Sequence, residues 1–205
     1  MKHYISIAGN IGVGKTTMAK FLARHLKIPL FLENFMENPY LECFYGDMKK
    51  WSFHSQLFFL KENFKSHLKI QELGASCIQD RTIFEDSEIF AANLFERGLM
   101  DRRDFETYRD LYQTMLRTLN YPDLIIYLHA PIEVLLERIS SRNRDFEKTM
   151  SQSYLSDLNQ FYKKWIERIQ EKTQILKIDS SKFNIYDDEK QCETILEMVR
   201  EQLIL

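Results

Sequence analysis

The sequence contains few residues of the kinds that mark metal, disulfide or membrane proteins. Its 205 residues include only three cysteines, which are widely spaced and form no C-x-x-C pair (Cys43, Cys77 and Cys192). That spacing argues against a zinc site and against a disulfide framework. No apolar run approaches the roughly 20 residues of a membrane span, and the stretch MKHYISIAGN is too short and too weakly basic for a signal peptide. We therefore expect a cytoplasmic protein that acts without a membrane.

The chain also lacks a strong charge of either sign. Its 28 Lys and Arg residues and 30 Asp and Glu residues give a formal net charge of −2. This balance provides no basic field for nucleic acid. No repeat, low-complexity tract or Gly/Ser/Pro-rich linker interrupts the sequence, and its hydrophobic content is 44%. We expect one well-packed domain over residues 1–205.

Short apolar runs alternate with long stretches of helical periodicity. We expect strands at residues 3–9, 28–33, 75–80, 123–130 and 174–179. We expect helices at residues 14–26, 51–73, 84–97, 104–119, 131–142, 151–172 and 188–203. This order predicts an α/β fold of three layers, with a central parallel five-stranded sheet flanked by helices. Sites in such sheets form at the carboxyl ends of strands, where Gly9, Glu33, Asp80 and Asp179 fall.

The stretch GNIGVGKT fits the phosphate-loop pattern G-x-x-x-x-G-K-[ST] and lies between a predicted strand and a predicted helix. Its glycines let backbone N–H groups turn towards phosphate oxygens at a helix N-terminus. Lys15 would reach the β- and γ-phosphates, and the Thr16 hydroxyl would ligate Mg²⁺. The alternative, a glycine-rich turn with an exposed lysine, is much rarer in this context. We expect ATP-binding by Gly9, Asn10, Ile11, Gly12, Val13, Gly14, Lys15, Thr16 and Thr17.

Switch GTPases, motor ATPases and small-molecule kinases all share this loop. A switch GTPase should carry the guanine-reading motif N-K-x-D, which the sequence does not contain. A motor ATPase usually needs a larger chain or partner domains. These exclusions favour a kinase that holds its acceptor within the same domain.

A kinase that acts on a hydroxyl needs a carboxylate to accept or orient its proton, and cations to stabilise the transferring phosphoryl group. Glu33 follows an apolar strand that fixes its position, whereas Glu37 lies in looser sequence and is the second candidate. Arg138, Arg142 and Arg144 follow the fourth predicted strand. Such a run can be a solvated helix face, but beside a phosphate loop it predicts a lid at residues 138–150 whose arginines close over the triphosphate.

Two further segments carry polar groups with a specific use. In FYGDMKKWSFHSQ, the amide of Gln56 could pair with the donor and acceptor edge of a base, although aromatic residues at helical spacing are more often core. In CIQDRTIFED, a strand ends in Asp80 and is followed by Arg81, with Glu85 and Asp86 one turn further on. An arginine at that place needs a functional reason.

Together these segments resemble the deoxyribonucleoside kinases, most closely the short bacterial deoxyadenosine/deoxyguanosine kinases. The likeness covers essentially the whole chain. Five stretches carry it: GNIGVGKTT, LENFMENPY, FYGDMKKWSFHSQ, DRTIFED and RISSRNRDFE. The resemblance implies ATP-dependent phosphorylation of the 5′-hydroxyl of a deoxynucleoside, a phosphate-loop fold with an arginine-rich lid, and a homodimer.

The resemblance also implies the residue roles. The catalytic group comprises Glu33 as the base, Arg81 beside it, and the cations Lys15, Arg142 and Arg144, while Arg138 joins the ATP site. Asp80 would hold Mg²⁺ through water, together with Thr16. The deoxynucleoside would be bound by Glu33, Arg81, Tyr45 and Glu147 at the sugar, and by Gln56, Asp86 and Phe90 at the base. The stretch LKIDSSKF resembles the loop that contacts the donor adenine.

Two departures from the family bear on the base. Where many members have a tryptophan five residues after the base glutamate, this chain has Asn38, within the ENPY version of short bacterial members. Where many members have an arginine that faces the aspartate equivalent to Asp86, this chain has Asn63. An ionised aspartate without that arginine suits an exocyclic amine, so we expect purines, adenine ahead of guanine. Cytosine also offers an amine, so deoxycytidine or broad specificity stays open.

Two other functions remain as alternatives. A thymidylate kinase-like enzyme would need a cation near the second strand for the acceptor phosphate, yet no arginine or lysine lies between Pro29 and Met48. A regulator that binds ATP without turnover would not need the set Lys15, Glu33, Asp80 and Arg81. Both observations favour the deoxynucleoside kinase.

Overall fold

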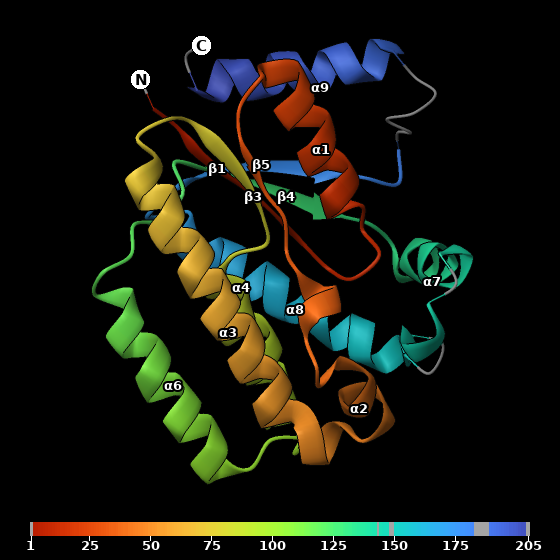
Figure 1. Ribbon diagram of the computed structural model, residues 1–205. Helices are drawn as coiled ribbons and strands as arrows, with labels where there is room; N and C mark the ends of the chain where they lie inside the picture. The colour runs from red at the N-terminus through yellow and green to blue at the C-terminus, as the bar shows by residue number, and fades with distance from the viewer. Residues whose placement is uncertain (1, 143, 148–149, 183–188, 204–205) are drawn as a thin grey trace.

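In the computed structural model, which describes residues 2–142, 144–147, 150–182 and 189–203, five parallel strands form one central sheet (Figure 1). The strands are β1 (Tyr4–Gly9), β2 (Leu30–Phe31), β3 (Cys77–Asp80), β4 (Leu124–His129) and β5 (Gln174–Asp179). Their order across the sheet is β2-β3-β1-β4-β5, and every pairing is parallel. The predicted α/β fold with a five-stranded parallel sheet is confirmed.

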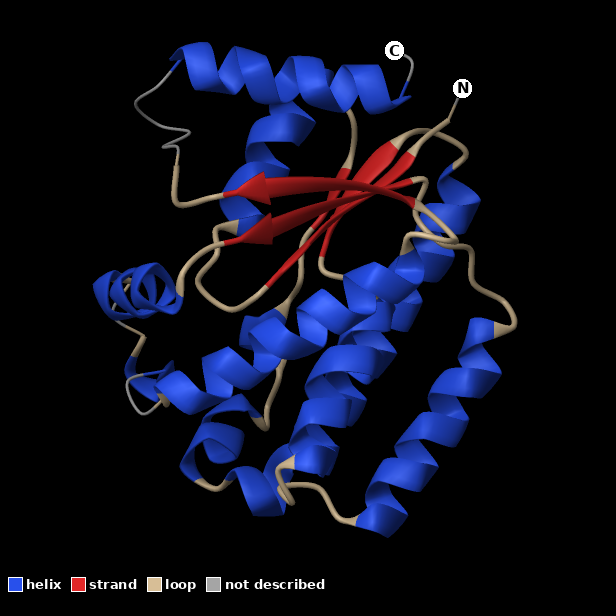
Figure 2. Cartoon of the chain, turned by 180° about the vertical axis from the view of Figure 1, so that it is seen from behind, coloured by secondary structure: helices blue, strands red, loops and turns tan. Residues whose placement is uncertain are grey.

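Helices cover both faces of this sheet (Figures 1 and 2). On one face lie α1 (Lys15–Leu26) and α9 (Glu189–Leu203), and on the other lie α3 (Met48–Leu73), α6 (Arg102–Leu116) and α8 (Gln152–Ile169). The central strands are therefore buried on both sides, as the 0% exposure of the consecutive residues Ser6, Ile7 and Ala8 of β1 shows. Within the described ranges, none of the helices is both long and apolar enough to cross a membrane.

The edge strand β2 is much shorter than the predicted strand at residues 28–33. Only Leu30 and Phe31 pair with β3. Pro29 has no N–H to donate and contributes only its carbonyl, which accepts from the N–H of Ile78 at 2.9 Å. The predicted boundary was wrong, and Glu33 lies in the loop beyond the strand rather than at its end.

Capping side chains set helix boundaries that periodicity misses. Helix α3 begins at Met48, before the predicted residue 51, because the Asp47 carboxylate accepts from the N–H of Lys50 at 3.1 Å. Helix α6 likewise begins at Arg102, where Asp101 caps it. Helix α9 begins at Glu189, and the predicted first residue, 188, lies outside the described residues.

The predicted helix at residues 84–97 contains a change of helical type. Helix α4 (Ile83–Glu85) runs into the π-helical turn η2 (Asp86–Ala91) and then into α5 (Ala92–Glu96). Short π-helical turns recur at functional sites because they re-aim side chains. Three other short helices were not predicted: α2 (Leu41–Gly46), which packs on α3, and the 3₁₀ turns η1 (Phe35–Glu37) and η3 (Asp145–Glu147). The helix α7 (Ile132–Ser141) agrees with the prediction within one residue.

Candidate active site

A cavity of about 1330 Å³ lies at the carboxyl ends of the strands. It is larger than the roughly 300–1,000 Å³ of a pocket for one small ligand, so it has room for two. Its lining brings together most of the predicted site residues: Ile11, Gly12, Val13, Gly14, Lys15, Thr16, Thr17, Glu33, Tyr45, Gln56, Arg81, Asp86, Phe90, Arg138, Arg142, Arg144 and Glu147. The predicted residues Gly9, Asn10 and Asp80 lie behind this lining.

Two glycines of the loop between β1 and α1 have no room for a side chain. A Cβ at Gly9 would lie 2.4 Å from the carbonyl oxygen of Leu128, and one at Gly12 would lie 2.9 Å from the carbonyl oxygen of Leu135. Both glycines also have positive φ angles, of 147° and 82°. The tight loop is therefore possible only with glycine at these positions.

Asn10 shapes the loop from within the protein. Its side-chain amide donates to the carbonyl of Leu155 at 2.9 Å and to Oδ1 of Asn159 at 2.7 Å, and its own Oδ1 accepts from the N–H of Ile11. Asn10 is 2% exposed and does not line the cavity. It ties the loop to α8, which is a structural role that the sequence motif did not reveal.

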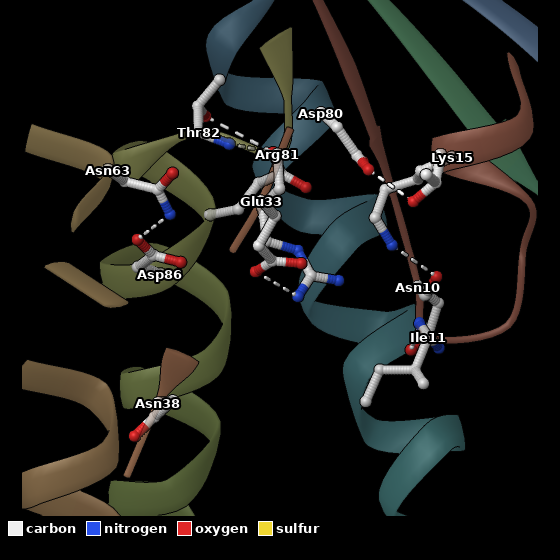
Figure 3. A network of polar contacts seen from close by, with 12 residues as sticks. Asn10, Ile11, Lys15, Glu33, Asn38, Asn63, Asp80, Arg81, Thr82 and Asp86 are labelled. Carbon is white, nitrogen blue, oxygen red and sulfur yellow. Dashed lines mark hydrogen bonds and ion pairs between the residues drawn. The ribbon is translucent and has the colours of Figure 1, made fainter. Parts of the chain in front are cut away.

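Lys15 lies across the loop at the start of α1. Its Nζ donates to the backbone carbonyl of Asn10 at 3.0 Å (Figure 3). Burial, together with the nearby Arg81, lowers the pKa of Lys15 to about 8, although Asp80 and Glu33 oppose this shift. The ammonium group is thus held at the cavity with only partial compensation of its charge, as a phosphate-binding lysine should be.

Thr16 and Asp80 meet beneath the loop. The Thr16 hydroxyl donates to Oδ2 of Asp80 at 2.5 Å, while Oδ1 of Asp80 is buried and has no hydrogen-bond partner among the described residues. Burial raises the pKa of Asp80, and Lys15 opposes this. A hydroxyl and a carboxylate oxygen with unused capacity are the hard oxygen donors that Mg²⁺ prefers, so these residues fit that ion.

Glu33 and Arg81 form an ion pair at the cavity. Oε1 of Glu33 accepts from Nη1 of Arg81 at 3.0 Å, and each side chain is only 11% exposed (Figure 3). The guanidinium group of Arg81 lies over the ring of Phe90, 4.4 Å from its centroid. Burial alone would lower the pKa of Arg81, but the surrounding acidic groups, Glu33 foremost, outweigh it and raise that pKa. The sequence prediction that these two residues act side by side is matched by this geometry.

A second polar group lies deeper, where α3 faces η2. The amide of Asn63 donates to Oδ2 of Asp86 at 2.7 Å (Figure 3), and Gln79 donates to Oδ1 of Asn63 at 3.4 Å. Asp86 thus has a partner after all, in the residue that replaces the family's arginine. Burial and Glu33 raise the pKa of Asp86 well above its usual range. Close by on the cavity wall, Oε1 of Gln56 is buried and has no partner among the described residues.

Two arginines of the segment predicted to be a lid bind Glu147 in this structure. Arg142 makes two hydrogen bonds of 2.6 Å to the two carboxylate oxygens of Glu147, and Arg144 approaches Oε1 at 3.4 Å. Glu147 is 5% exposed, and the neighbouring ring of Phe146 stacks on Tyr45. Of the predicted lid at residues 138–150, residues 143, 148 and 149 lie outside the described residues.

Arg138 has a different environment from the other two arginines. It donates to the carbonyl of Val13 in the loop at 3.2 Å and to the side chain and carbonyl of Ser180 at 3.0 and 2.7 Å. It therefore joins the phosphate loop to the segment after β5, the predicted donor-adenine loop. The last residue of that predicted loop, Phe183, lies outside the described residues.

Sequence reasoning missed one polar centre behind the cavity. Glu85 is completely buried and accepts hydrogen bonds from Gly9, Thr82 and Tyr162. The only signal in the sequence is the capping-box spacing from Thr82 to Glu85. Periodicity does not show which distant groups a buried carboxylate reaches.

Comparison with known protein families gives one match over nearly the whole chain, to the deoxynucleoside kinase model, at residues 5–205. A deoxyadenosine/deoxycytidine kinase of Bacillus subtilis is 39% identical over 197 residues, which cover 95% of this chain and 90% of that protein. A deoxyadenosine kinase of Dictyostelium discoideum is 41% identical over 180 residues, covering 88% and 73% of the two chains.

Solved structures give the same result. The deoxyadenosine kinase from M. mycoides with the products dCMP and dCDP bound superimposes with a TM-score of 0.86 at 29% identity, covering 97% of this chain and 99% of that one. The same enzyme with bound dATP gives a TM-score of 0.83 at 28% identity, with 99% and 100% covered.

Proposed function

The chain belongs to the deoxynucleoside kinase family and phosphorylates deoxynucleosides with ATP, and on that premise we propose that it transfers a phosphoryl group to the 5′-hydroxyl of deoxyadenosine ahead of deoxyguanosine. The single observation that carries this proposal is the buried Glu33–Arg81 pair, 3.0 Å apart at the cavity beside Lys15. A base and a cation held together there suit a neutral hydroxyl as acceptor.

On the donor side, the loop from Gly9 to Thr17 binds the triphosphate through its backbone N–H groups, and Lys15 binds the β- and γ-phosphates. Arg142 and Arg144 turn from Glu147 to the transferring group, whose developing negative charge they stabilise. Arg138 holds the loop against the adenine-binding segment after β5. Support for this division comes from the different partners of the three arginines.

Mg²⁺ would be held by Thr16 directly and by Asp80 through water. Support comes from the unpartnered Oδ1 of Asp80 and from the Thr16 hydroxyl that points at the same carboxylate. Bound there, the ion would shield the charge of the β- and γ-phosphate oxygens.

On the acceptor side, Glu33 takes the proton from the 5′-hydroxyl as the new phosphorus–oxygen bond forms, and the bond from the γ-phosphorus to the bridging oxygen breaks to release ADP. Arg81 fixes the direction of the Glu33 carboxylate, since an arginine–carboxylate pair has a defined geometry. Tyr45 and Glu147 bind the 3′-hydroxyl of the sugar. Their closeness across the cavity is supported by the stacking of Phe146 on Tyr45.

The base is read by Gln56 and Asp86, with Phe90 beside them. Because Asn63 occupies only Oδ2 of Asp86, the other oxygen remains available to the base edge, and in the ionised form of Asp86 it accepts from an exocyclic amine. Adenine presents such an amine, and so does cytosine. Deoxycytidine is therefore the second candidate acceptor, and the Bacillus subtilis relative named for both nucleosides supports it.

A steady-state panel tests the proposal. Initial rates are measured with Mg-ATP and deoxyadenosine, deoxyguanosine, deoxycytidine or thymidine, and with thymidine monophosphate. We expect the highest kcat/KM for deoxyadenosine. Turnover of the monophosphate alone would overturn the assignment of a nucleoside acceptor and favour a thymidylate kinase-like reaction.

We further propose that the chain works in the cytoplasm as a homodimer of one domain each, residues 1–205, through the neighbouring helices α3 and α6. Leu68 on α3 and Leu111 on α6 are each 37% exposed, so these neighbouring helices carry apolar side chains that a second copy of the chain would cover. Light scattering after gel filtration measures the mass. A monomer at micromolar concentration would contradict the dimer.

A further inference from the structure

Glu85 is a buried carboxylate that the proposed chemistry does not use. Its exposure is 0%, and its two oxygens accept from three separate segments of the chain. Oε1 accepts from the Tyr162 hydroxyl at 2.8 Å and from the N–H of Gly9 at 3.4 Å, and Oε2 accepts from the N–H of Thr82 at 2.9 Å. Burial of a carboxylate is costly unless hydrogen bonds compensate it, and the donors around Glu85 provide this compensation.

The segments that Glu85 joins belong to the two halves of the reaction. Gly9 begins the phosphate loop on the donor side. Thr82 follows Arg81, which pairs with Glu33 on the acceptor side. Tyr162 belongs to α8, the helix that also holds the phosphate loop through Asn10.

The backbone of Arg81 needs support from its neighbours. Its φ angle of 64° is left-handed, a conformation that costs a non-glycine residue about 1–2 kcal/mol. Two N–H groups hold it there: that of Arg81 itself, which donates to the carbonyl of Ile7 at 3.1 Å, and that of Thr82, which donates to Glu85. Without Glu85 only one of these restraints remains.

Tyr162 supports the Arg81 side chain from the other direction. Its ring meets the edge of Phe90, with 6.4 Å between ring centroids, and Phe90 lies under the guanidinium group of Arg81. Tyr162 thus contacts both the Glu85 carboxylate, which holds the Arg81 backbone, and the Phe90 ring, over which the Arg81 guanidinium group lies.

We propose that Glu85, with Tyr162 as its partner, is a positioning residue that fixes the position of Arg81 relative to the phosphate loop. The γ-phosphate of ATP and the 5′-hydroxyl of the acceptor then meet in line. This inference rests on the proposed role of Arg81. Its consequence is kinetic, because small misplacements of reacting groups lower kcat strongly while binding contacts survive.

Glu85→Gln is the direct test because it keeps the size of the side chain but replaces one of its two acceptor oxygens with an NH₂ group. A carboxamide has one oxygen and one NH₂, so it cannot accept from Gly9 and Tyr162 on one side and from Thr82 on the other. We expect kcat to fall by about 10–100-fold, with the KM values for ATP and deoxyadenosine changed by less than about threefold.

The decisive measurement repeats Glu85→Gln in an Arg81→Lys background. If Glu85 acts by positioning Arg81, then Glu85→Gln in the Arg81→Lys background should lower kcat by less than about threefold, since the guanidinium group that Glu85 positions is already gone. Equal losses in the two backgrounds would mean that Glu85 acts independently of Arg81 and would overturn the proposal. A wild-type kcat for Glu85→Gln would overturn it as well.

Tyr162→Phe provides the second variant, for use also where Glu85→Gln does not fold. It removes a single hydroxyl and leaves the ring contact with Phe90, so we expect a loss of about 3–10-fold in kcat that again disappears in the Arg81→Lys background. An unchanged kcat for Tyr162→Phe would contradict the pairing and overturn the proposal.

Glu88→Gln is the matched control. Glu88 lies one turn beyond Glu85 and also accepts from a tyrosine, Tyr112, at 3.0 Å, and from Arg168 at 3.1 Å. These partners face away from the cavity, so kcat should stay at the wild-type value. Wild-type turnover of deoxynucleosides tests the proposed function separately. If only thymidine monophosphate were phosphorylated, the same comparison of backgrounds with that acceptor would still decide the role of Glu85.

Discussion

Lys15 shows how burial adjusts a single charge. Burial and the nearby Arg81 lower its pKa to about 8, so the ammonium group of the free protein loses its proton not far above neutrality. A lysine is charged below its pKa, which means that the positive charge proposed to bind phosphate is present at low pH and disappears as the pH rises.

The pH dependence of ATP use follows from this shift. We expect kcat/KM for ATP to decline as the pH rises above about 8. Lys15→Arg is the control, because arginine stays charged throughout this range and removes the alkaline decline even if overall activity is lower. Steady-state rates at subsaturating ATP from about pH 6.5 to about pH 9.5 measure it. A flat wild-type profile would contradict the assignment.

Glu33→Gln tests the proposed base. Because the amide cannot take a proton from the 5′-hydroxyl, we expect kcat to fall by a factor on the order of 10²–10⁴. The variant keeps the size of the side chain, and its carbonyl can still accept from Arg81, so KM for ATP should change little. Glu37→Gln, in the 3₁₀ turn that follows, is the matched control and should keep wild-type turnover. Near-normal turnover of Glu33→Gln would refute proton removal by this residue.

Asp86→Asn tests how the base is read. In the variant, Oδ1 would accept from Asn63 as Oδ2 of Asp86 does now, and the new NH₂ would face the base. A donor there suits a 6-oxo purine rather than a 6-amino purine. We expect the ratio of kcat/KM for deoxyadenosine to that for deoxyinosine to fall by about tenfold or more, corresponding to about 1.4 kcal/mol. An unchanged ratio would show that Asp86 does not contact the base edge.

At the scale of secondary-structure elements, the lid depends on a choice of partners. Arg142 and Arg144 bind Glu147 here, whereas in the proposed reaction they bind phosphate. Phosphate oxygens can compete because Arg142 is 30% exposed although Glu147 is only 5% exposed. The same carboxylate is then available for the 3′-hydroxyl of the sugar.

Arg142→Ala should therefore affect chemistry more than stability. We expect kcat to fall by about 10–10³-fold because a charge on the transferring group is lost. The melting temperature should fall by less, because Arg144 remains 3.4 Å from the buried Glu147 carboxylate and keeps a cation beside it. Arg102→Ala, which removes an exposed pair with Glu106, is the control and should leave kcat unchanged. A fall in melting temperature without a fall in kcat would assign Arg142 a purely structural role.

Elements of the fold differ in how well the sequence predicts them. The long helices and the strands β1 and β4 follow from apolar periodicity, which depends on burial alone. The length of β2 does not, because only Leu30 and Phe31 pair with β3, and apolar periodicity does not show which residues of an edge strand are paired. The π-helical turn η2 and the short helix α2 are also missed, since a six-residue segment has too few turns to show a period.

The candidate site divides in the same way. Motif residues such as Lys15, Glu33 and Arg81 were predicted because their chemistry requires a fixed residue type at a fixed spacing. The partnership of Asn63 with Asp86 and the burial of Glu85 were not, because both depend on side chains that meet only after the helices pack. The bonds of the Asn10 side chain to α8 were not predicted either, and its place at the nucleotide stays a prediction for its backbone.

At the scale of the whole molecule, the two ligands share one cavity and should stabilise the fold together. At about 100 times its Kd, each ligand adds about 2.7 kcal/mol to the free energy of unfolding. For a domain of this size that corresponds to a rise of about 5–11 °C in melting temperature. Differential scanning fluorimetry with Mg-ATP, deoxyadenosine and a non-hydrolysable ATP analogue plus deoxyadenosine measures it.

Removal of Mg²⁺ by a chelator provides the contrast. The stabilisation by ATP should weaken when Thr16 and Asp80 lose the ion, whereas that by deoxyadenosine alone should persist. If the chelator weakened both equally, the assignment of the metal to the donor side would be wrong.

The hydrogen bonds of Asn10 have a consequence for how the protein folds during its synthesis on the ribosome. The shape of the phosphate loop depends on Leu155 and Asn159, which are synthesised almost 150 residues after it. Its strand, β1, also needs both neighbours, β3 and β4, to become the centre of the sheet. The nascent chain therefore carries an unformed nucleotide site until α8 has been synthesised, and ATP can assist its folding only after α8 has left the exit tunnel.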